Sequence, residues 1–398
     1  MRLHSTSEIR RQNAFHIVRE VIDHPDNTVS DISRKYGISV ATVSSIISIL
    51  RNDGLLVLSG EKASTGGRKA LLYSINPEYA YFVGISITVH TVKSVLIRMD
   101  GLVLKQTFLY RTFEDTKEYC DFIYDLYLRT AEGVKEPSAV VLSFPGRFDK
   151  DTSVITRDDG FVVDVFNIEK ILFCFRDVKG FSVCDASKFS ALPMLQTNPD
   201  LNDCVFVSIN RAISGTIIRD GHLFPLSKSD CNFGKMIVGA ESCPDKKPAF
   251  RSFAACCSAS HIVDTLKSLG LENIVMENAG DPGVSRYSGF FREIREGNRM
   301  FQRLWDVYLF NLAAGLNNIY AMFGLPIVIS GDMANKISGF SDELHAHLSA
   351  LNADITRDSI SFSETGLFDD PIGAALKARY DLLEELVLQA SNRRSAEE

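Results

Sequence analysis

Small hydroxyl side chains gather on one side of a predicted helix near the start of the chain. In "ISVATVSSIISILRNDG", apolar residues recur at helical spacing, namely Val40, Val43, Ile46, Ile47 and Leu50. The opposite side carries Ala41, Thr42, Ser44, Ser45 and Ser48. Short hydroxyl side chains let a helix backbone approach the major groove of DNA, where they can hydrogen-bond to base edges or phosphates. The pattern therefore predicts a helix that recognises DNA.

Two further helices and a hairpin are predicted around this helix. "SEIRRQNAFHIVREVIDHP" has helical spacing and stops at Pro25, and "TVSDISRKYG" has Thr28 and Asp31 at the spacing of a capping box before it ends at Gly37. The second helix, the "YGIS" turn and the third helix have the order of a helix-turn-helix unit. "LLVLSG" and "KALLYSI" read as two strands, joined by the basic segment "EKASTGGRK".

This hairpin is predicted to act as a wing that brings Arg68 and Lys69 to the DNA backbone or into the minor groove. The predicted DNA-contacting residues are Ser39, Thr42, Ser44, Ser45, Arg51, Arg68 and Lys69. The alternative is a three-helix protein-binding module with an exposed Ser/Thr face. The order of three helices and a basic wing favours DNA.

Length and charge place this module on a larger body. A length of 398 residues suggests two or three domains. The composition, with 45% hydrophobic and 23% charged residues, is typical of a soluble globular protein. The chain has a net charge of -7, but its first 80 residues hold ten Lys or Arg and eight Asp or Glu. The weakly basic module and the acidic body fit nucleic-acid binding at one end only.

Neither export nor membrane insertion is predicted. No charged-then-apolar leader opens the sequence, and the eight cysteines lack the spacing of a disulfide framework, so we expect reduced thiols in a cytoplasmic protein. Residues 307–330 carry no charge, but Asn311, Asn317 and Asn318 would be costly in lipid. We expect a buried helix there, followed after "GLP" by a strand.

From Tyr79 onward, β-rich runs alternate with helical ones, which predicts an α/β body of two lobes with a cleft between them. One of the predicted helices covers residues 250–268.

The order of motifs in this body resembles the ROK family of bacterial sugar kinases and sugar-responsive repressors. The resemblance covers nearly the whole chain and rests on the wing residues "TGGR" and on the segments "VVLSFPGRFD", "SVCDASKFSALPML", "SGTIIRDGHLF", "LAAGLNNIYAMFGLPIVISGDMA" and "DDPIGAALKA". It implies an N-terminal winged helix-turn-helix (residues 1–78) followed by a two-lobed, actin-like, sugar kinase-like body. The expected lobes are residues 79–200 and 201–370, with a C-terminal helix over 371–398 that packs back on the first lobe.

The chain departs from the family at both phosphate loops. "GISITVHTV" stands where the family has "GVDIGGTKI", so Ser86, Thr88 and Val89 replace an acidic residue and paired glycines. "NRAIS" at residues 210–214 replaces "GTGIG". Glycine cradles let backbone amides approach phosphate, so their loss predicts a protein that is not an enzyme and has no catalytic residues. Asp185, at the place of the family's catalytic base, is then expected to be structural. The alternative is a divergent sugar kinase with an appended DNA-binding module.

The family's zinc motif is also degenerate, so no metal or cofactor is predicted. Val238 stands where the family has a metal-binding histidine. Cys257 and His261 would share a helix face four residues apart, and Cys243 is the third candidate ligand. Small apolar packing residues are the favoured interpretation of these cysteines.

The resemblance places an effector, a sugar or sugar phosphate, in the interlobe cleft. By resemblance the cleft would be lined by Gly146, Arg147, Asp185 and Lys235. Arg147 and Lys235 favour an acidic or phosphorylated ligand, unless both are solvated surface charges. A body without any small ligand, serving as a scaffold for dimerisation and partner docking, is a third interpretation. The other predicted partners are a double-stranded DNA operator, bound as a repressor, and a second copy of the chain in a homodimer or dimer of dimers.

Overall fold

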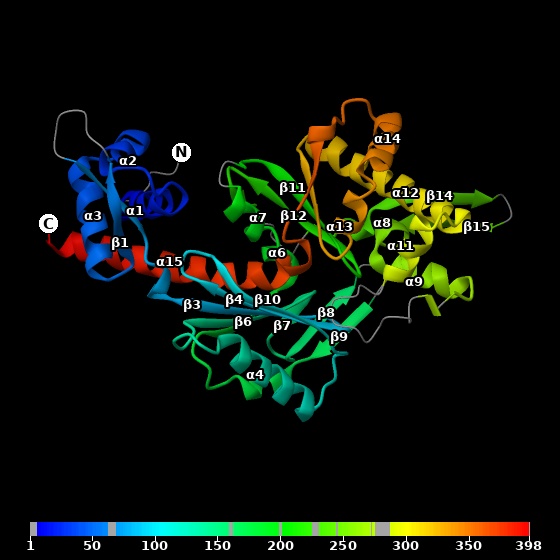
Figure 1. The fold of residues 1–398 in the computed structure, drawn as a ribbon, viewed down its shortest axis with the longest axis horizontal. Coiled ribbons are helices and arrows are strands. Elements are labelled where there is room, and N and C mark those ends of the chain that lie inside the picture. Colours follow the sequence, from blue (N-terminus) through cyan, green and yellow to red (C-terminus); the bar gives the residue numbers. More distant parts are fainter. Residues whose placement is uncertain are drawn as a thin grey trace.

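The computed structural model describes residues 6–62, 69–158, 161, 163–198, 201–224, 231–243, 246–271, 273–274 and 287–397. Figure 1 shows a small N-terminal domain at one end and two lobes beside it, with one long C-terminal helix that runs from the lobes to the small domain.

The N-terminal domain consists of three helices and a hairpin. They are α1 (Thr6–Asp23), α2 (Val29–Tyr36), α3 (Val40–Asn52), β1 (Leu56–Lys62) and β2 (Ala70–Ile75), with β1 antiparallel to β2. The capping box of Thr28 and Asp31 starts α2, and Gly37 ends it with a positive φ of 67°, as the sequence predicts. On α3, Val43, Ile46, Ile47 and Leu50 are buried, but Val40 is 52% exposed. Val40 is the first residue of this helix.

Lobe 1 is built on a five-stranded sheet in the order β10-β6-β3-β4-β5. Its elements are β3 (Tyr81–Ile87), β4 (Thr91–Arg98), β5 (Val103–Tyr110), α4 (Lys117–Ala131), β6 (Ala139–Phe144), α5 (Glu169–Cys174) and β10 (Phe181–Asp185). A separate three-stranded sheet joins β7 (Arg147–Asp149), β8 (Val154–Asp158) and β9 (Val163–Asn167). Alternate residues of β3 face opposite sides, so Val83 and Ile85 pack with α4 while Phe82 faces the C-terminal helix. A 3₁₀ turn (Pro77–Tyr79) joins β2 to β3.

Two short helices lead from lobe 1 to lobe 2, α6 (Ala186–Phe189) and α7 (Leu192–Thr197). The sheet of lobe 2 has the order β13-β12-β11-β16-β17. Its strands are β11 (Cys204–Ile209), β12 (Ile213–Arg219), β13 (His222–Leu223), β16 (Ile327–Ser330) and β17 (Ile360–Phe362). A hairpin of β14 (Ile237–Cys243) and β15 (Lys246–Ser252) stands apart from this sheet. The helices are α8 (Phe253–Cys257), α9 (Ala259–Ser268), α11 (Ser288–Arg295), α12 (Arg299–Phe323), α13 (Ala334–Ser338) and α14 (Ser341–Leu351). Short 3₁₀ turns lie at Phe233–Lys235, Arg357–Ser359 and Gly366–Phe368.

The C-terminal helix α15 (Asp369–Glu397) connects the body to the N-terminal domain (Figure 1). It lies so close to β3 that a Cβ atom on Gly84 would come within 2.0 Å of the carbonyl oxygen of Pro371. At its other end, Arg393 Nη1 is 2.7 Å from Asp53 Oδ1 at the end of α3. One hydrophobic cluster therefore includes the core of the N-terminal domain, α15 and one face of the lobe 1 sheet.

Two sequence predictions about lobe 2 have different outcomes. The helix predicted over residues 250–268 was confirmed for residues 253–257 and 259–268, which form α8 and α9, but β15 runs to Ser252 and Ser258 separates the two helices. Over residues 307–330, the prediction was right, because α12 ends at Gly324 in a left-handed conformation and the buried strand β16 follows. In the described part of the chain, no helix combines the length and apolarity needed to cross a membrane.

Candidate nucleic-acid interface and interlobe cleft

The outer surface of α3 is small and polar. Ala41, Ser44, Ser48 and Arg51 are exposed, whereas Thr42 and Ser45 are half-buried. Ser39 begins the helix: its Oγ accepts the Thr42 amide at 3.1 Å and lies 2.8 Å from Thr42 Oγ1. Of the predicted DNA-contacting residues here, Ser44 and Arg51 are exposed on the helix, and Ser39, which is also exposed, has a capping function.

The hairpin of β1 and β2 places two lysines beside the helix-turn-helix. Lys69 is exposed, with its Nζ 3.1 Å from Glu61 Oε2 across the hairpin. Lys62 Nζ lies 3.4 Å from Asp31 Oδ2. The predicted contact Arg68 lies outside the described residues.

A buried carboxylate holds α2 against α1. Glu20 is 2% exposed and accepts hydrogen bonds from Asn27 Nδ2 (2.6 Å), Lys35 Nζ (2.8 Å) and Tyr36 Oη (2.7 Å). Burial opposes ionisation of Glu20, but these donors and the charge of Lys35 outweigh it and lower its pKa. The helix-turn-helix geometry thus depends on one ionised side chain that the sequence analysis did not single out.

Between the lobes lies a cleft of about 1010 Å³. All four residues predicted for it, Gly146, Arg147, Asp185 and Lys235, line its wall. Arg147 and Lys235 are exposed there. Asp185 caps α6, and its Oδ1 accepts bonds from the amide (3.2 Å) and hydroxyl (2.7 Å) of Ser187. Gly146 has φ 122°, and a Cβ atom there would meet the carbonyl oxygen of Thr156 at 2.6 Å.

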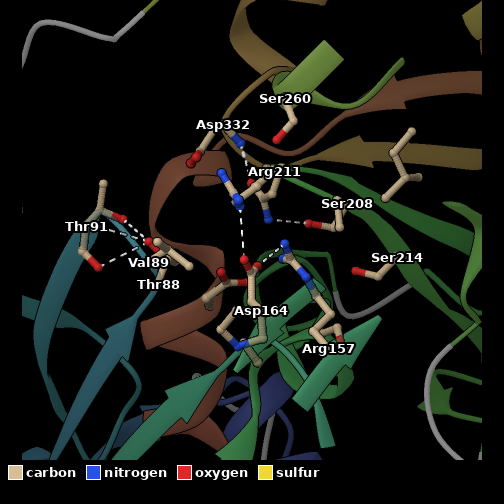
Figure 2. A pocket seen from close by; sticks show the side chains of 18 of the residues that line it. Thr88, Val89, Thr91, Arg157, Asp164, Ser208, Arg211, Ser214, Ser260 and Asp332 are labelled. Atoms are coloured by element: carbon tan, nitrogen blue, oxygen red, sulfur yellow. Dashed lines mark hydrogen bonds and ion pairs between the residues drawn. The ribbon is translucent and has the colours of Figure 1, made fainter. Parts of the chain in front are cut away.

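Ion pairs across the cleft join the two lobes. Lys93 of β4, which is 2% exposed, places its Nζ 3.0 Å from Asp332 Oδ1 of lobe 2. In a second pair the cation is on lobe 2 and the anion on lobe 1: Arg211 Nε lies 3.3 Å from Asp164 Oδ1 of β9. Asp164 also pairs with Arg157 (Figure 2). Each lobe therefore contributes one cation and one anion to the interlobe contacts.

The environment of Lys93 keeps it charged. Burial would lower its pKa, but the carboxylates of Asp332, Asp370 and Asp369 raise it overall. Asp369 accepts a bond from Ser363 Oγ (2.8 Å), and burial raises its pKa to about 6. The sequence signal for this cluster was Lys93, the one charged residue in the apolar run from Thr91 to Ile97 of β4.

The two turns at which the resemblance would place phosphate loops are closed by internal hydrogen bonds. The turn between β3 and β4 closes with the Thr88 amide donating to the Thr91 carbonyl (2.9 Å) and the two hydroxyls 2.8 Å apart (Figure 2). In the second loop, Asn210 Oδ1 accepts the Asp332 amide at 2.7 Å and Asn210 Nδ2 donates to Ser208 Oγ at 3.0 Å.

The candidate metal ligands do not converge in the described residues. Cys257 is buried, with its Sγ 3.8 Å from the Tyr308 carbonyl oxygen, and burial raises its thiol pKa. His261 stacks against the ring of Tyr308, and burial lowers its pKa. The side chain of Cys243 lies outside the description. Over the described part of the chain, no three His, Cys, Asp or Glu side chains form a group that could hold a metal ion.

Comparisons with known proteins define the class. Residues 10–57 match the family described as winged helix-turn-helix DNA-binding. The chain is a DNA-binding protein with a winged helix-turn-helix domain and an α/β body of the sugar kinase type.

The whole chain is similar to ROK regulators. It is 22% identical over 356 residues to the xylose repressor of Staphylococcus xylosus, covering 86% of this chain and 88% of that protein. Its fold matches that of a ROK family transcriptional regulator described as a homologue of the E. coli MLC protein, with a TM-score of 0.67, 15% identity and coverage of 96% and 99% of the two chains. The ROK hexokinase of Thermus thermophilus matches 76% of this chain and 99% of its own, with a TM-score of 0.55 and 16% identity. These findings support a DNA-binding transcriptional repressor with the ROK fold.

Proposed function

We propose that this repressor reads a double-stranded operator with α3 and that a small ligand in the interlobe cleft controls its DNA affinity. The observation that carries the first part is the exposed face of α3, where Ser44 and Ser48 leave room for the major groove. Arg51 and Lys69 are exposed beside it and suit phosphate contacts. We also propose a homodimer or dimer of dimers on a pseudo-palindromic site, since such dimers read half-sites roughly 34 Å apart.

The proposed ligand is a sugar or sugar phosphate. The chain is similar to proteins named xylose repressors, and the cleft offers amide, hydroxyl and carboxylate groups at Asn210, Ser208 and Asp332. Arg147 and Lys235, exposed on the cleft wall, would favour a phosphorylated or acidic form.

We further propose that the chain is not a kinase, although kinases share its fold. Thr88 and Val89 fill the tight turn where a phosphate loop would need glycine, and Asp185 is engaged as a helix cap. Equilibrium binding with a non-hydrolysable ATP analogue tests this. Saturation at physiological nucleotide concentration would contradict the proposal and favour the divergent kinase.

The DNA-binding proposal is tested by selecting duplexes from a random library with the purified full-length protein. We expect Ser44→Ala to change the selected sequence, because a groove-facing hydroxyl contributes to base readout. Lys69→Ala should weaken binding to all sequences and reduce the salt dependence by about one phosphate contact. Ser268→Ala, an exposed serine on α9 of lobe 2, is the matched control. An unchanged preference in Ser44→Ala would refute the placement of α3.

The effector proposal is tested by thermal melts against sugars, sugar phosphates and the ATP analogue. A ligand at a hundred times its dissociation constant adds about 2.7 kcal/mol to the free energy of unfolding. A shift with a sugar that disappears in Asp332→Ala would place the ligand in the cleft. No shift across the panel would favour a body that serves dimerisation alone.

A further inference from the structure

The N-terminal domain contacts both lobes, and the two contacts differ in kind. Against lobe 1 it is continuous with a hydrophobic core: Ile17 and Val43 belong to the same buried cluster as Val387 of α15 and Phe82 of β3. Cores of this kind are close-packed and move as a unit. The N-terminal domain, α15 and lobe 1 therefore form one body.

The hydrogen-bonded contact with lobe 2 is polar, and Leu223 beside it packs against the same hydrophobic cluster. Arg19 Nη1 of α1 lies 2.8 Å from His222 Nε2, and Arg19 Nη2 donates to the Gly221 carbonyl at 3.5 Å. His222 Nδ1 lies 2.6 Å from the Asp220 carbonyl oxygen, which can only accept. Nδ1 therefore carries the proton, and Nε2 is left as the acceptor for the guanidinium of Arg19.

The turn that carries His222 is held to lobe 2. Asp220 and Gly221 both have positive φ, of 51° and 69°. The Asp220 amide donates to Asp203 Oδ1 at 3.0 Å, and the Gly221 amide donates to the Asn202 carbonyl at 2.8 Å. A displacement of lobe 2 thus displaces His222 with it.

Strand β12 joins this turn to the cleft. It begins at Ile213, two residues after Arg211, and ends at Arg219, directly before the turn. Its seven residues span roughly 23 Å at about 3.3 Å each. It pairs with β11 along its length, so it moves as part of the sheet. One end of a single strand therefore meets Asp164 of lobe 1 through Arg211, and the other end meets Arg19 of the N-terminal domain.

We propose that β12 couples the cleft to the N-terminal domain: when the Arg211–Asp164 pair separates, lobe 2 shifts and the Arg19–His222 contact is lost, which changes the support of α1 and hence DNA affinity. This rests on the proposed function and adds the residues through which a ligand in the cleft would act. A ligand with an anionic group that competes with Asp164 for Arg211 would produce the same displacement.

A double-mutant cycle in the full-length protein tests the coupling without any effector. Arg211→Ala opens the interlobe pair, His222→Phe removes the acceptor but keeps a ring, and neither residue is on the DNA-reading helix. We expect each to weaken binding to the selected duplex about fivefold, the lower end of allosteric couplings, and the double variant to be no weaker than the worse single variant. Asp164→Asn should reproduce Arg211→Ala from the lobe 1 side. Arg357→Ala, in an exposed pair with Asp342 on lobe 2, should have no effect.

The coupling would be overturned if the losses of DNA affinity from Arg211→Ala and His222→Phe multiplied in the double variant. It would also be overturned if neither Arg211→Ala nor Asp164→Asn changed DNA affinity. Hydrogen exchange supplies a readout that does not need DNA. Amides of α1 and of residues 220–223 should exchange at least about threefold faster in Arg211→Ala and at the wild-type rate in Arg357→Ala. If these amides exchange at the wild-type rate in Arg211→Ala, the inference is refuted, even if the protein binds DNA. Failure to select any duplex refutes the proposed function, while the exchange result still decides the coupling.

Discussion

Replacing Glu20 should destabilise the helix-turn-helix more than its position on a surface helix would suggest. The carboxylate is almost fully buried and accepts bonds from Tyr36 Oη, Asn27 Nδ2 and Lys35 Nζ. A hydrogen bond to a charged group contributes about 1.5–3 kcal/mol, and losing its partner also leaves the half-buried Tyr36 hydroxyl desolvated. Lys35 is 49% exposed, so its share is below about 1 kcal/mol. We expect Glu20→Ala to lower the free energy of unfolding of the domain by about 3 kcal/mol.

Glu20→Gln is the matched variant, because it keeps the shape and one acceptor oxygen but loses the charge. Its cost should be about 1 kcal/mol. Urea denaturation followed by far-UV circular dichroism measures both variants. A cost below about 1 kcal/mol for Glu20→Ala would refute the argument that this carboxylate joins α2 to α1.

The same residue gives a pH dependence with a definite sign. Because the folded state lowers the pKa of Glu20, its contribution is fully present above the ordinary value of 4.5 and is lost as pH falls through the folded value. The difference in stability between wild type and Glu20→Gln should therefore shrink on acidification. A difference that stays constant from pH 7 to pH 3 would contradict the direction of the shift.

Three further changes have expected outcomes. Gly84→Ala should cost about 3 kcal/mol or prevent folding, because its Cβ would collide with the backbone of Pro371 and push α15 off the sheet, as thermal melts would reveal. Lys93→Met should destabilise the body more than Asp332→Asn does, because loss of Lys93 leaves the carboxylates around it without their buried counter-charge, whereas Asp332 is partly exposed. A larger loss of stability for Asp332→Asn in urea denaturation would contradict the buried pair. Ser39→Ala should cost about 1 kcal/mol through loss of the α3 cap and Ser39→Asn much less, and equal losses would argue against a capping function.

Local patterns in the sequence were sufficient for the N-terminal domain and for much of the body. The capping box of Thr28 and Asp31, the glycine that ends α2 and the apolar spacing of α3 depend on neighbours within one or two turns, so they can be read from the chain alone. Only the start of the helix predicted at residues 250–268 was wrong, because residues 250–252 belong to β15, which is defined by pairing with β14, and pairing of this kind leaves little trace in local composition.

The candidate sites also contain some residues that the sequence could place and some contacts that it could not. Arg147 and Lys235 could be placed on the cleft by motif order, but the Lys93–Asp332 pair joins residues 239 positions apart, and no local pattern indicates it.

The sequence by itself determined the DNA-binding module, the α/β class of the body and the absence of glycine from residues 86–89 and 210–214, because each is a property of residue type at short spacing. Only the tertiary structure decided that Ser39 and Asp185 are caps, that two opposed ion pairs join the lobes, and that Arg19 meets His222. Those contacts arise where packed elements bring distant side chains within a few ångströms. Their positions follow from the burial of whole helix and sheet faces, which a single segment does not specify.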